Sequence, residues 1–429
     1  MIADSGSNFA AQPLTAPRTA TIGSDQLDRA VATLLTVLVG MRVQVNFEAP
    51  VALLAGLILL PVWAGCALRS RRYLGLVVLA GLAAASGLVL TIAAPTPTST
   101  STTILIVRTA MLAALAVNTG VLIWAAGLLG TTRLALTFGC GVILGIPFNL
   151  DTAQENAWRF TYSLAIAILA VAIADSIGRL WVQLTVLLTL AAIGLVNDSR
   201  SNSSFLILTA ILLVGQRVFQ RRSGIAAAQR RWVGIGLIIA SGFALYQLVV
   251  GIILEGGFGE VTQQRTQAQI ETSGLLILGG RPEIAASTAL ISRHPLGMGS
   301  GVIASGADIN AAKESMWAIG YDPNNGYVER FMFGRGIEVH SLLGDLWIWF
   351  GLAGAALAAL IVISVLNATL TAYTRATLSA LLGYLSIRMI WDLLFSPASS
   401  ALRFLPLTFC LAVCSMSAVR AHEIGRGGG

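Results

Sequence analysis

Charged side chains are scarce in this chain of 429 residues, where Asp, Glu, Lys and Arg together make up 11% of the sequence. Hydrophobic residues make up 56%, and the mean hydropathy is +0.79. These values lie far from those of soluble globular proteins. The alternating apolar and polar positions of a membrane β-strand are also lacking, and the apolar runs are too long for such strands. The sequence therefore predicts an integral membrane protein built from helices.

Lysine and cysteine are also rare. Lys313 is the only lysine, so arginine carries almost all of the net charge of +7. The four cysteines, Cys66, Cys140, Cys410 and Cys414, all fall in apolar runs with no histidine or carboxylate close by. We therefore expect small buried residues rather than a metal site, and no cofactor.

About twelve apolar runs approach the length of roughly 20 residues that a helix needs to cross a bilayer. The expected spans are 29–45, 50–68, 74–94, 104–128, 134–148, 161–177, 180–196, 203–217, 232–254, 340–366, 376–394 and 402–419. The first and the eighth are short or weak, so we predict an all-α polytopic protein with ten to twelve transmembrane helices. The expected divisions are a disordered cytoplasmic tail (1–28), helices one to nine (29–254), one large outward loop with short amphipathic helices (255–339), helices ten to twelve (340–419) and a cytoplasmic tail (420–429).

Arginines cluster after every second span, which predicts the orientation of the chain in the bilayer. They are Arg69, Arg71, Arg72, Arg133, Arg179, Arg217, Arg221, Arg222, Arg230, Arg231, Arg375, Arg420 and Arg426. Short loops rich in arginine stay in the cytoplasm. Both termini are therefore expected on the cytoplasmic side of a bacterial cytoplasmic membrane, with the loop 255–339 on the outer face.

A second set of arginines falls on the outward side, where orientation does not explain them. This set is Arg159, Arg200, Arg265, Arg281, Arg293, Arg330 and Arg335. Solvation of a surface loop is one explanation. Anion binding is the other, because a guanidinium presents a planar, permanently charged fork that matches phosphate oxygens.

Two of these arginines stand at the starts of predicted helices. Arg200 comes just before span eight, and Arg281 precedes Pro282, which favours the first turn of a short amphipathic helix. A helix N-terminus with an arginine beside it is a suitable seat for a phosphate. Each arginine also has a carboxylate nearby, Asp198 or Glu283, so a simple ion pair is the alternative.

Two histidines, His294 and His340, lie in the large loop and directly after it. His294 opens the run HPLGMGSG, whose glycines predict a structural turn because no strand precedes them. His340 directly precedes a long apolar helix. An imidazole at that boundary either takes a proton from an attacking hydroxyl or serves as an interfacial structural residue. Glu338 and Asp345 are close enough in the sequence to orient it.

Arg108 and Arg388 fall inside apolar spans, where a charge is costly and has to face a partner or a polar cavity. Asp392 follows Arg388 by four residues, on the same face of a helix. A buried ion pair is therefore one interpretation, and the lining of a lipid-headgroup cavity is the other. We include Arg293 and Arg388 as supporting candidates for a functional site.

The order of these motifs resembles that of the O-antigen ligase and O-antigen polymerase superfamily. The matching pieces are Ser-Arg at 199–200, Arg281 before a short helix, HPLGMGSG at 294–301, and His340 opening HSLLGDLWIWFGLAG. They span roughly residues 185–366, and Ser341 stands where the family usually has Asn. The resemblance implies a GT-C-like fold and transfer of a glycan from a polyprenyl diphosphate carrier to an acceptor hydroxyl. It also implies that Arg200 and Arg281 hold the diphosphate and that His340 activates the acceptor or assists displacement, without a metal.

The expected function is therefore a membrane glycosyltransferase of the ligase or polymerase type. Its expected partners are a polyprenyl-diphosphate-linked glycan donor, a lipid or glycan acceptor and membrane lipids, with no nucleic acid. Two alternatives stay open. One is a transporter or flippase for a lipid-linked sugar, a class in which inverted repeats are common. The other is a metal-dependent GT-C glycosyltransferase that uses Glu48 in the first outward loop.

Overall fold

The computed structural model describes residues 22–44, 50–95, 99–148, 156–221, 281–334 and 336–427, with a few positions between 232 and 242. Within these residues the chain is helical, and β-structure is limited to isolated bridges. The predicted all-α class is confirmed. Most of the span predicted at 232–254 lies outside the described residues, as do Glu48, Arg265 and Arg335.

The helices before the large loop form most of a bundle. They are α1 (Ile22–Met41), α2 (Val51–Ile58), α3 (Leu60–Ala67), α4 (Arg71–Ile92), α5 (Thr102–Leu129), α6 (Thr131–Leu144), the short η2 (Ile146–Phe148), the π-helical η4 (Trp158–Tyr162), α7 (Ser163–Ile177), α8 (Leu180–Val196) and α9 (Arg200–Arg221). Apolar faces drive their association: α1 packs against α6, α8 against α9, and α5 against α3 and α4.

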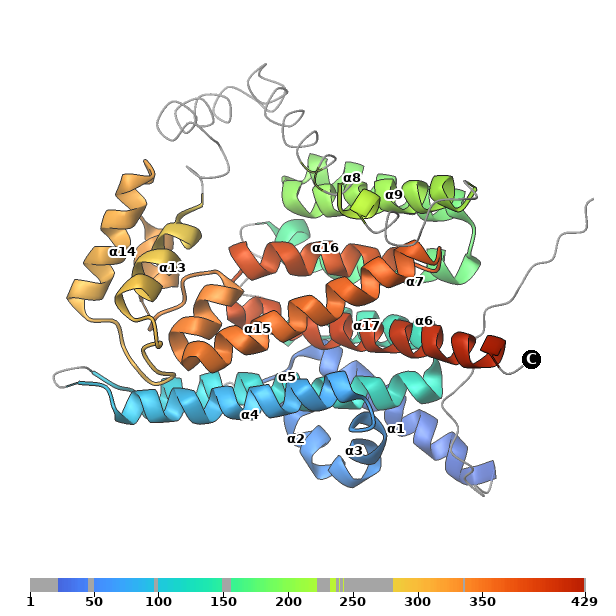
Figure 1. Ribbon diagram of the computed structural model, residues 1–429, viewed down its shortest axis with the longest axis horizontal. Helices are drawn as coiled ribbons and strands as arrows, with labels where there is room; N and C mark the ends of the chain where they lie inside the picture. The colour runs from blue at the N-terminus through green and yellow to red at the C-terminus, as the bar shows by residue number, and fades with distance from the viewer. Residues whose placement is uncertain are drawn as a thin grey trace, which may run out of the picture.

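The later helices complete the bundle and its polar end. They are α13 (Pro282–Arg293), α14 (Gly306–Ala318), the π-helical η5 (Tyr327–Met332), α15 (Leu342–Thr374), α16 (Ala380–Phe395) and α17 (Ala398–Gly427). α15 packs against α4 and α17, and α17 packs against α5. α13 and α14 lie together at one end of the bundle, beside the start of α15 (Figure 1). The prediction of a short helix after Arg281 is confirmed by α13.

Six helical stretches in the described part of the chain are long and apolar enough to cross a membrane. They are Arg71–Ile92, Thr102–Leu129, Trp158–Ile177, Arg200–Val218, Leu342–Thr374 and Ala398–Val419. Large apolar side chains such as Val78, Ile92 and Ile363 are exposed on the outside of the bundle, where lipid tails would surround them. These helices indicate a multi-pass membrane protein, whereas the predicted ten to twelve spans are not confirmed.

The span predicted at 50–68 is divided into α2 and α3. Pro61 stands in the first turn of α3. Its ring removes the main-chain donor that a continuous helix would direct at the carbonyl oxygen of Leu57 and also crowds that oxygen, so the two helices do not join smoothly. Each half has eight residues, too few to cross a bilayer alone.

The helix predicted to follow His340 is broken at Gly351. The backbone there has φ 64° and ψ −151°, which only glycine adopts readily. The break frees the carbonyl oxygen of Ile348, which accepts the main-chain N–H groups of Met298 at 2.7 Å and Gly299 at 3.3 Å. Gly297 and Gly299 have φ of 92° and 115°. The HPLGMGSG run therefore forms a structural turn, as predicted, and this turn fills the break in α15.

Arg108 fastens this turn to α5 from inside the bundle. Its Nη1 donates to the carbonyl oxygen of Ser300 at 2.9 Å, and its Nη2 donates to that of Ile337 at 2.8 Å. The guanidinium also lies 4.4 Å from the ring centre of Trp349. These contacts account for a buried charge in an apolar helix, and the side chain joins the loop to α5 rather than lining a cavity.

The cysteines are only partly buried, contrary to the prediction. Cys410 is buried, Cys66 and Cys414 are half-buried, and Cys140 is exposed. Cys140 lies on the face of α6 that points out of the bundle. A small, weakly polar thiol is tolerated there, because the apolar surroundings of a transmembrane bundle extend beyond its own core.

Candidate functional site

His340 lies in the turn that leads into α15. Its φ of 60° is a left-handed conformation that is uncommon for a residue with a side chain. The hydroxyl of Ser341 caps the helix by accepting the N–H of Gly344 at 3.2 Å, and it donates to the carbonyl oxygen of Leu393 at 3.0 Å. The surrounding contacts thus hold a strained backbone in place, a situation that is concentrated at functional sites. They fix the half-buried imidazole at the start of the helix.

Tyr327 and Glu283 form a hydrogen-bonded row with His340. The hydroxyl of Tyr327 lies 2.8 Å from Nδ1 of His340 and donates to Oε1 of Glu283 at 3.0 Å. The tyrosine and imidazole rings meet edge to face, with centroids 4.9 Å apart. The three residues come from η5, α13 and the turn before α15, so the row joins three separate elements.

Burial governs the protonation of this row. It lowers the pKa of His340, although the carboxylate of Glu338 and a hydrogen bond with the main chain of Phe331 act in the opposite direction. Burial also raises the pKa of Tyr327 and that of Glu283. At neutral pH the imidazole is therefore uncharged and the phenol keeps its proton.

Arg281 stands directly before α13 and lies beside the row. We refer to the row together with Arg281 and Arg159 as the cluster. Its guanidinium lies 4.6 Å from the ring centre of Trp391 and 5.1 Å from that of Phe395, both on α16. Its Nη1 is 4.0 Å from Oε1 of Glu283, the outer limit for an ion pair. Burial lowers the pKa of Arg281, and the charge of Glu283 raises it. Aromatic stacking rather than a close carboxylate therefore holds this cation.

Arg159 supplies a second positive charge near Arg281. Its charge acts on Arg281 and contributes to the lowered pKa of that residue, after the effect of burial. Arg159 lies on η4, is exposed, and has its guanidinium 4.9 Å from the ring centre of Phe160. π-Helical turns often mark functional sites, and both η4 and η5 contribute residues here.

Arg200 is the first residue of α9. Its Nε is 3.0 Å from Oδ1 of Asp198, so the ion pair considered as the alternative for this residue is formed. The side-chain amide of Asn156 donates to the carbonyl oxygen of Asn197 at 2.9 Å, which places the turn before α9 beside the start of η4. Arg200 therefore lies near the element that carries Arg159, and the described contacts do not join it to His340.

Glu338 and Asp345 support the backbone around His340 rather than its ring. Oδ1 of Asp345 accepts the N–H of Val339 at 2.6 Å, and its Oδ2 accepts the N–H of Ala398 at 3.0 Å. Oε1 of Glu338 accepts the N–H of Ser399 at 2.9 Å. Among the described contacts neither carboxylate hydrogen-bonds the imidazole. The two side chains instead tie the turn before α15 to the start of α17.

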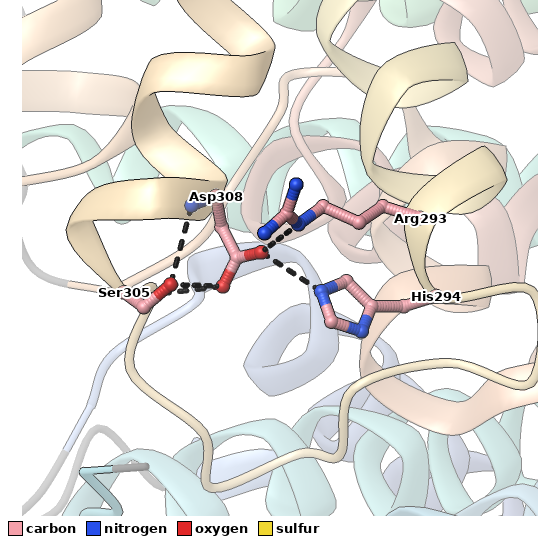
Figure 2. A network of polar contacts seen from close by, with 4 residues as sticks. All are labelled: Arg293, His294, Ser305 and Asp308. Atoms are coloured by element: carbon pink, nitrogen blue, oxygen red, sulfur yellow. Dashed lines mark hydrogen bonds and ion pairs between the residues drawn. The ribbon is translucent and has the colours of Figure 1, made fainter. Parts of the chain in front are cut away.

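Arg293 belongs to a separate polar cluster between α13 and α14 (Figure 2). Its Nε lies 3.0 Å from Oδ1 of Asp308, and Nε2 of His294 lies 2.8 Å from the same oxygen. Asp308 and Ser305 also form a reciprocal cap at the start of α14. Burial opposes ionisation, but hydrogen bonds from His294 and Ser305 hold the pKa of Asp308 below its usual range. The cluster joins two helices, consistent with the interpretation of His294 as a turn residue.

Arg388 forms the ion pair expected from its spacing. Its Nε is 3.4 Å from Oδ2 of Asp392, one turn further along α16. The guanidinium also lies 5.8 Å from the ring centre of Phe404 on α17. The side chain of Arg388 therefore contacts its own helix, α16, and the neighbouring helix α17.

Three residues of the cluster were not selected from the sequence as site residues. Tyr327 had no distinguishing motif, Glu283 was considered only as an ion-pair partner for Arg281, and Arg159 was one of many outward arginines. The outward position of Arg159 was the only signal that could have singled it out. The other two are recognisable only from their contacts with His340.

The chain matches no family model and no curated protein. What the cluster can do chemically therefore follows from its own arrangement. It combines an uncharged imidazole, a phenol, a carboxylate and two neighbouring guanidinium groups at one end of a bundle of apolar helices. Such a set can accept a proton next to a place where an anion is stabilised.

Proposed function

We propose that this protein is a membrane glycosyltransferase that moves a glycan from a polyprenyl diphosphate carrier to an acceptor hydroxyl. The motifs that resemble O-antigen ligases and polymerases indicate this class. The observation that carries the proposal is the linkage of His340 to Arg281 through Tyr327 and Glu283 at the polar end of the bundle. A general base for the acceptor and a cation for the leaving group are the two functions that this reaction needs.

Arg281 binds the diphosphate in this proposal, with Arg200 as the second predicted contact. The leaving diphosphate gains negative charge as the glycosidic bond breaks, and cations held in place beforehand stabilise that charge more than water does. Stacking on Trp391 and Phe395 orients Arg281 before any substrate binds. The nearby charge of Arg159 supports the same role, because an anion between two cations relieves their repulsion.

His340 acts as the general base of the transfer step. The acceptor oxygen attacks the anomeric carbon of the donor sugar, and the bond from that carbon to the diphosphate oxygen breaks. The electron pair of this bond leaves with the diphosphate towards the arginines. The acceptor proton passes to Nε2 of His340 and then to solvent. The products are the glycosylated acceptor and the carrier diphosphate.

The proposal includes the placement of the site on the outer face of a bacterial cytoplasmic membrane. The arginines that follow every second predicted span support this orientation, with both termini in the cytoplasm. A GT-C-like arrangement of about twelve spans is part of the same proposal. In this proposal the polyprenyl tail stays in the bilayer, against the apolar side chains exposed on the outside of the helices.

Substitution of the proposed base and the proposed cation tests this function. We expect His340→Ala to lower glycan transfer by about 10²–10⁴-fold, the usual contribution of a general base. Arg281→Ala should abolish transfer as well, while the protein stays in the membrane at its normal level. Arg330→Ala is the matched control, because Arg330 is an exposed arginine of the same loop. Full activity of both test variants would contradict the proposal.

The surface polysaccharide of a deletion strain separates the two types of reaction. Chains of a single repeat unit would indicate a polymerase. Long chains that stay on the carrier would indicate a ligase.

The break in α15 favours a transporter of lipid-linked sugars as a second candidate. Interrupted helices line the substrate site in many transporters, and Gly351 interrupts α15 near His340. A transporter does not need a general base. Movement of the lipid-linked sugar across the membrane that is unaffected by His340→Ala would therefore favour this candidate over the glycosyltransferase.

A further inference from the structure

We propose that Tyr327 and Glu283 are positioning residues that hold the proton of His340 on Nδ1 and stabilise the imidazole once it has accepted a second proton on Nε2. This inference rests on the proposed function, because it assigns His340 the role of a base. It adds two residues that the sequence motifs did not identify, and it states how each acts.

The hydrogen-bond directions follow from a count of the available protons. A phenol has one proton to donate, and the hydroxyl of Tyr327 donates it to Oε1 of Glu283. Because an ionised Glu283 can only accept, the contact of 2.8 Å with Nδ1 of His340 then makes the imidazole the donor. An uncharged imidazole has one N–H and one lone pair. With the proton on Nδ1, the lone pair is on Nε2 and accepts from an acceptor hydroxyl. The main-chain contact with Phe331, which raises the pKa of His340, stabilises the imidazolium that then forms.

The row also responds to the charge that develops during the reaction. When Nε2 takes a proton, the imidazole becomes a cation, and the phenol oxygen of Tyr327 faces its Nδ1–H. The carboxylate of Glu283 polarises that phenol towards the imidazole. The negative charge of Glu283 therefore stabilises the imidazolium of His340 through one hydroxyl, as the buried aspartate of a serine protease triad does by direct contact.

Other charged and polar groups near His340 also contribute to the pH dependence of the site. Glu338 lies two residues before His340, the main chain of Phe331 bonds the imidazole, and Arg281 lies 4.0 Å from the carboxylate of Glu283. Burial raises the pKa of Glu283, so its charge is lost at a higher pH than usual as the solution is acidified. The acid limb of the pH profile therefore reflects Glu283 and His340 together.

Two substitutions remove different parts of the row. Tyr327→Phe deletes the hydroxyl and keeps the ring that packs edge to face on the imidazole. Glu283→Gln keeps an oxygen that accepts from Tyr327 and removes the charge. The new amide group replaces Oε2, which is buried and has no hydrogen-bond partner among the described residues. Tyr73→Phe is the matched control, because the hydroxyl of Tyr73 donates to the main-chain carbonyl oxygen of Ala116 at 3.0 Å, on helices that carry no residue of the row.

The test is the pH dependence of glycan transfer by the full-length protein in lipid vesicles, with a polyprenyl-diphosphate-linked glycan as donor. We expect Tyr327→Phe and Glu283→Gln to lower kcat on the order of tenfold to a hundredfold, a fraction of the effect of a general base. The KM for the donor should stay near its normal value. Loss of the supporting charge makes the imidazole a weaker base, so the acid limb should move to lower pH in both variants.

The second measurement is kcat of the double variant, compared with kcat of each single variant. Once Tyr327 has lost its hydroxyl, the charge of Glu283 no longer reaches His340 through the row. Glu283→Gln should therefore change kcat little in the Tyr327→Phe background. Thermal unfolding of each variant shows whether it folds, and Glu283→Gln keeps the test open if Tyr327→Phe does not.

The outcomes distinguish this inference from the proposed function. If His340→Ala is inactive while both variants keep the normal pH profile and kcat, the positioning role is refuted and the glycosyltransferase proposal stands. If His340→Ala is fully active while Arg281→Ala is inactive, the base is misassigned and the positioning role is refuted. If both are fully active, the glycosyltransferase proposal fails as well. A purely structural role would lower the melting temperature without moving the acid limb, and that result also overturns the inference.

Discussion

Gly351→Ala should destabilise the protein because Gly351 is the point at which α15 breaks. The backbone values of φ 64° and ψ −151° lie in a region that is almost restricted to glycine and costs other residues about 1–3 kcal/mol. A Cβ atom would also lie closer to the carbonyl oxygen of Leu296 than real Cβ atoms come to other atoms. Overpacking of this kind costs about 1–3 kcal/mol. The expected loss is therefore about 2–6 kcal/mol, a large part of a typical stability of about 5–15 kcal/mol.

The substitution should also reduce activity, because the break positions the segment that begins at His340. If α15 straightens, the carbonyl oxygen of Ile348 returns to its helix and the main-chain N–H of Met298 loses its acceptor. The turn that contains Met298 would then move. Arg108 would carry the movement towards His340, because it bonds both Ser300 of this turn and Ile337, three residues before His340. Both effects are measured on the purified protein, by thermal unfolding followed through tryptophan fluorescence and by the rate of glycan transfer.

Gly81→Ala is the matched control for this experiment. Gly81 lies within α4, and a Cβ atom there would meet no atom within 4 Å. Alanine at such a helical position is expected to stabilise the protein by about 0.5–1 kcal/mol. A Gly351→Ala variant that melts at the normal temperature with normal activity would refute the reasoning about the break.

Two further predictions concern buried polar side chains, Arg108 and Asp345, that join separate segments of the chain. Arg108→Met should cost about 3–6 kcal/mol, because two hydrogen bonds from a charged group are lost and each contributes about 1.5–3 kcal/mol; an unchanged melting temperature would show that these bonds contribute nothing. Asp345→Asn should cost about 1–3 kcal/mol, because the amide replaces one of two oxygens that each accept a main-chain N–H. Its glycan transfer should fall with stability, and a variant as stable and active as the normal protein would show that one acceptor is enough.

Local sequence rules located several parts of the site correctly. Pro282 marks the start of α13, and the glycines of HPLGMGSG form the predicted turn. Arg388 and Asp392 pair at the helical spacing that suggested the contact. In each case the residues that determine the structure lie within a few positions of one another, so backbone preference or helical periodicity is sufficient.

The same rules did not predict the lengths of the helices. The spans expected at 50–68 and 340–366 are both interrupted. Pro61 explains the first interruption and was visible in the sequence. Gly351 explains the second, but many glycines occur inside intact transmembrane helices. Only the turn packed against Ile348 shows that this glycine breaks its helix.

The sequence by itself determined the class of the protein and the positions of most helices, because long apolar runs are stable in a bilayer only as helices whose backbone bonds are satisfied internally. It also identified His340, Arg200 and Arg281 as candidates. Tertiary structure decided which residues meet. Tyr327 contacts His340, 13 residues further along the sequence, and Glu283, 44 residues before it. Arg108 bonds Ser300, which is 192 residues further along. Contacts over such separations depend on how α5, α13, η5 and α15 pack, and no local preference of the chain encodes that arrangement.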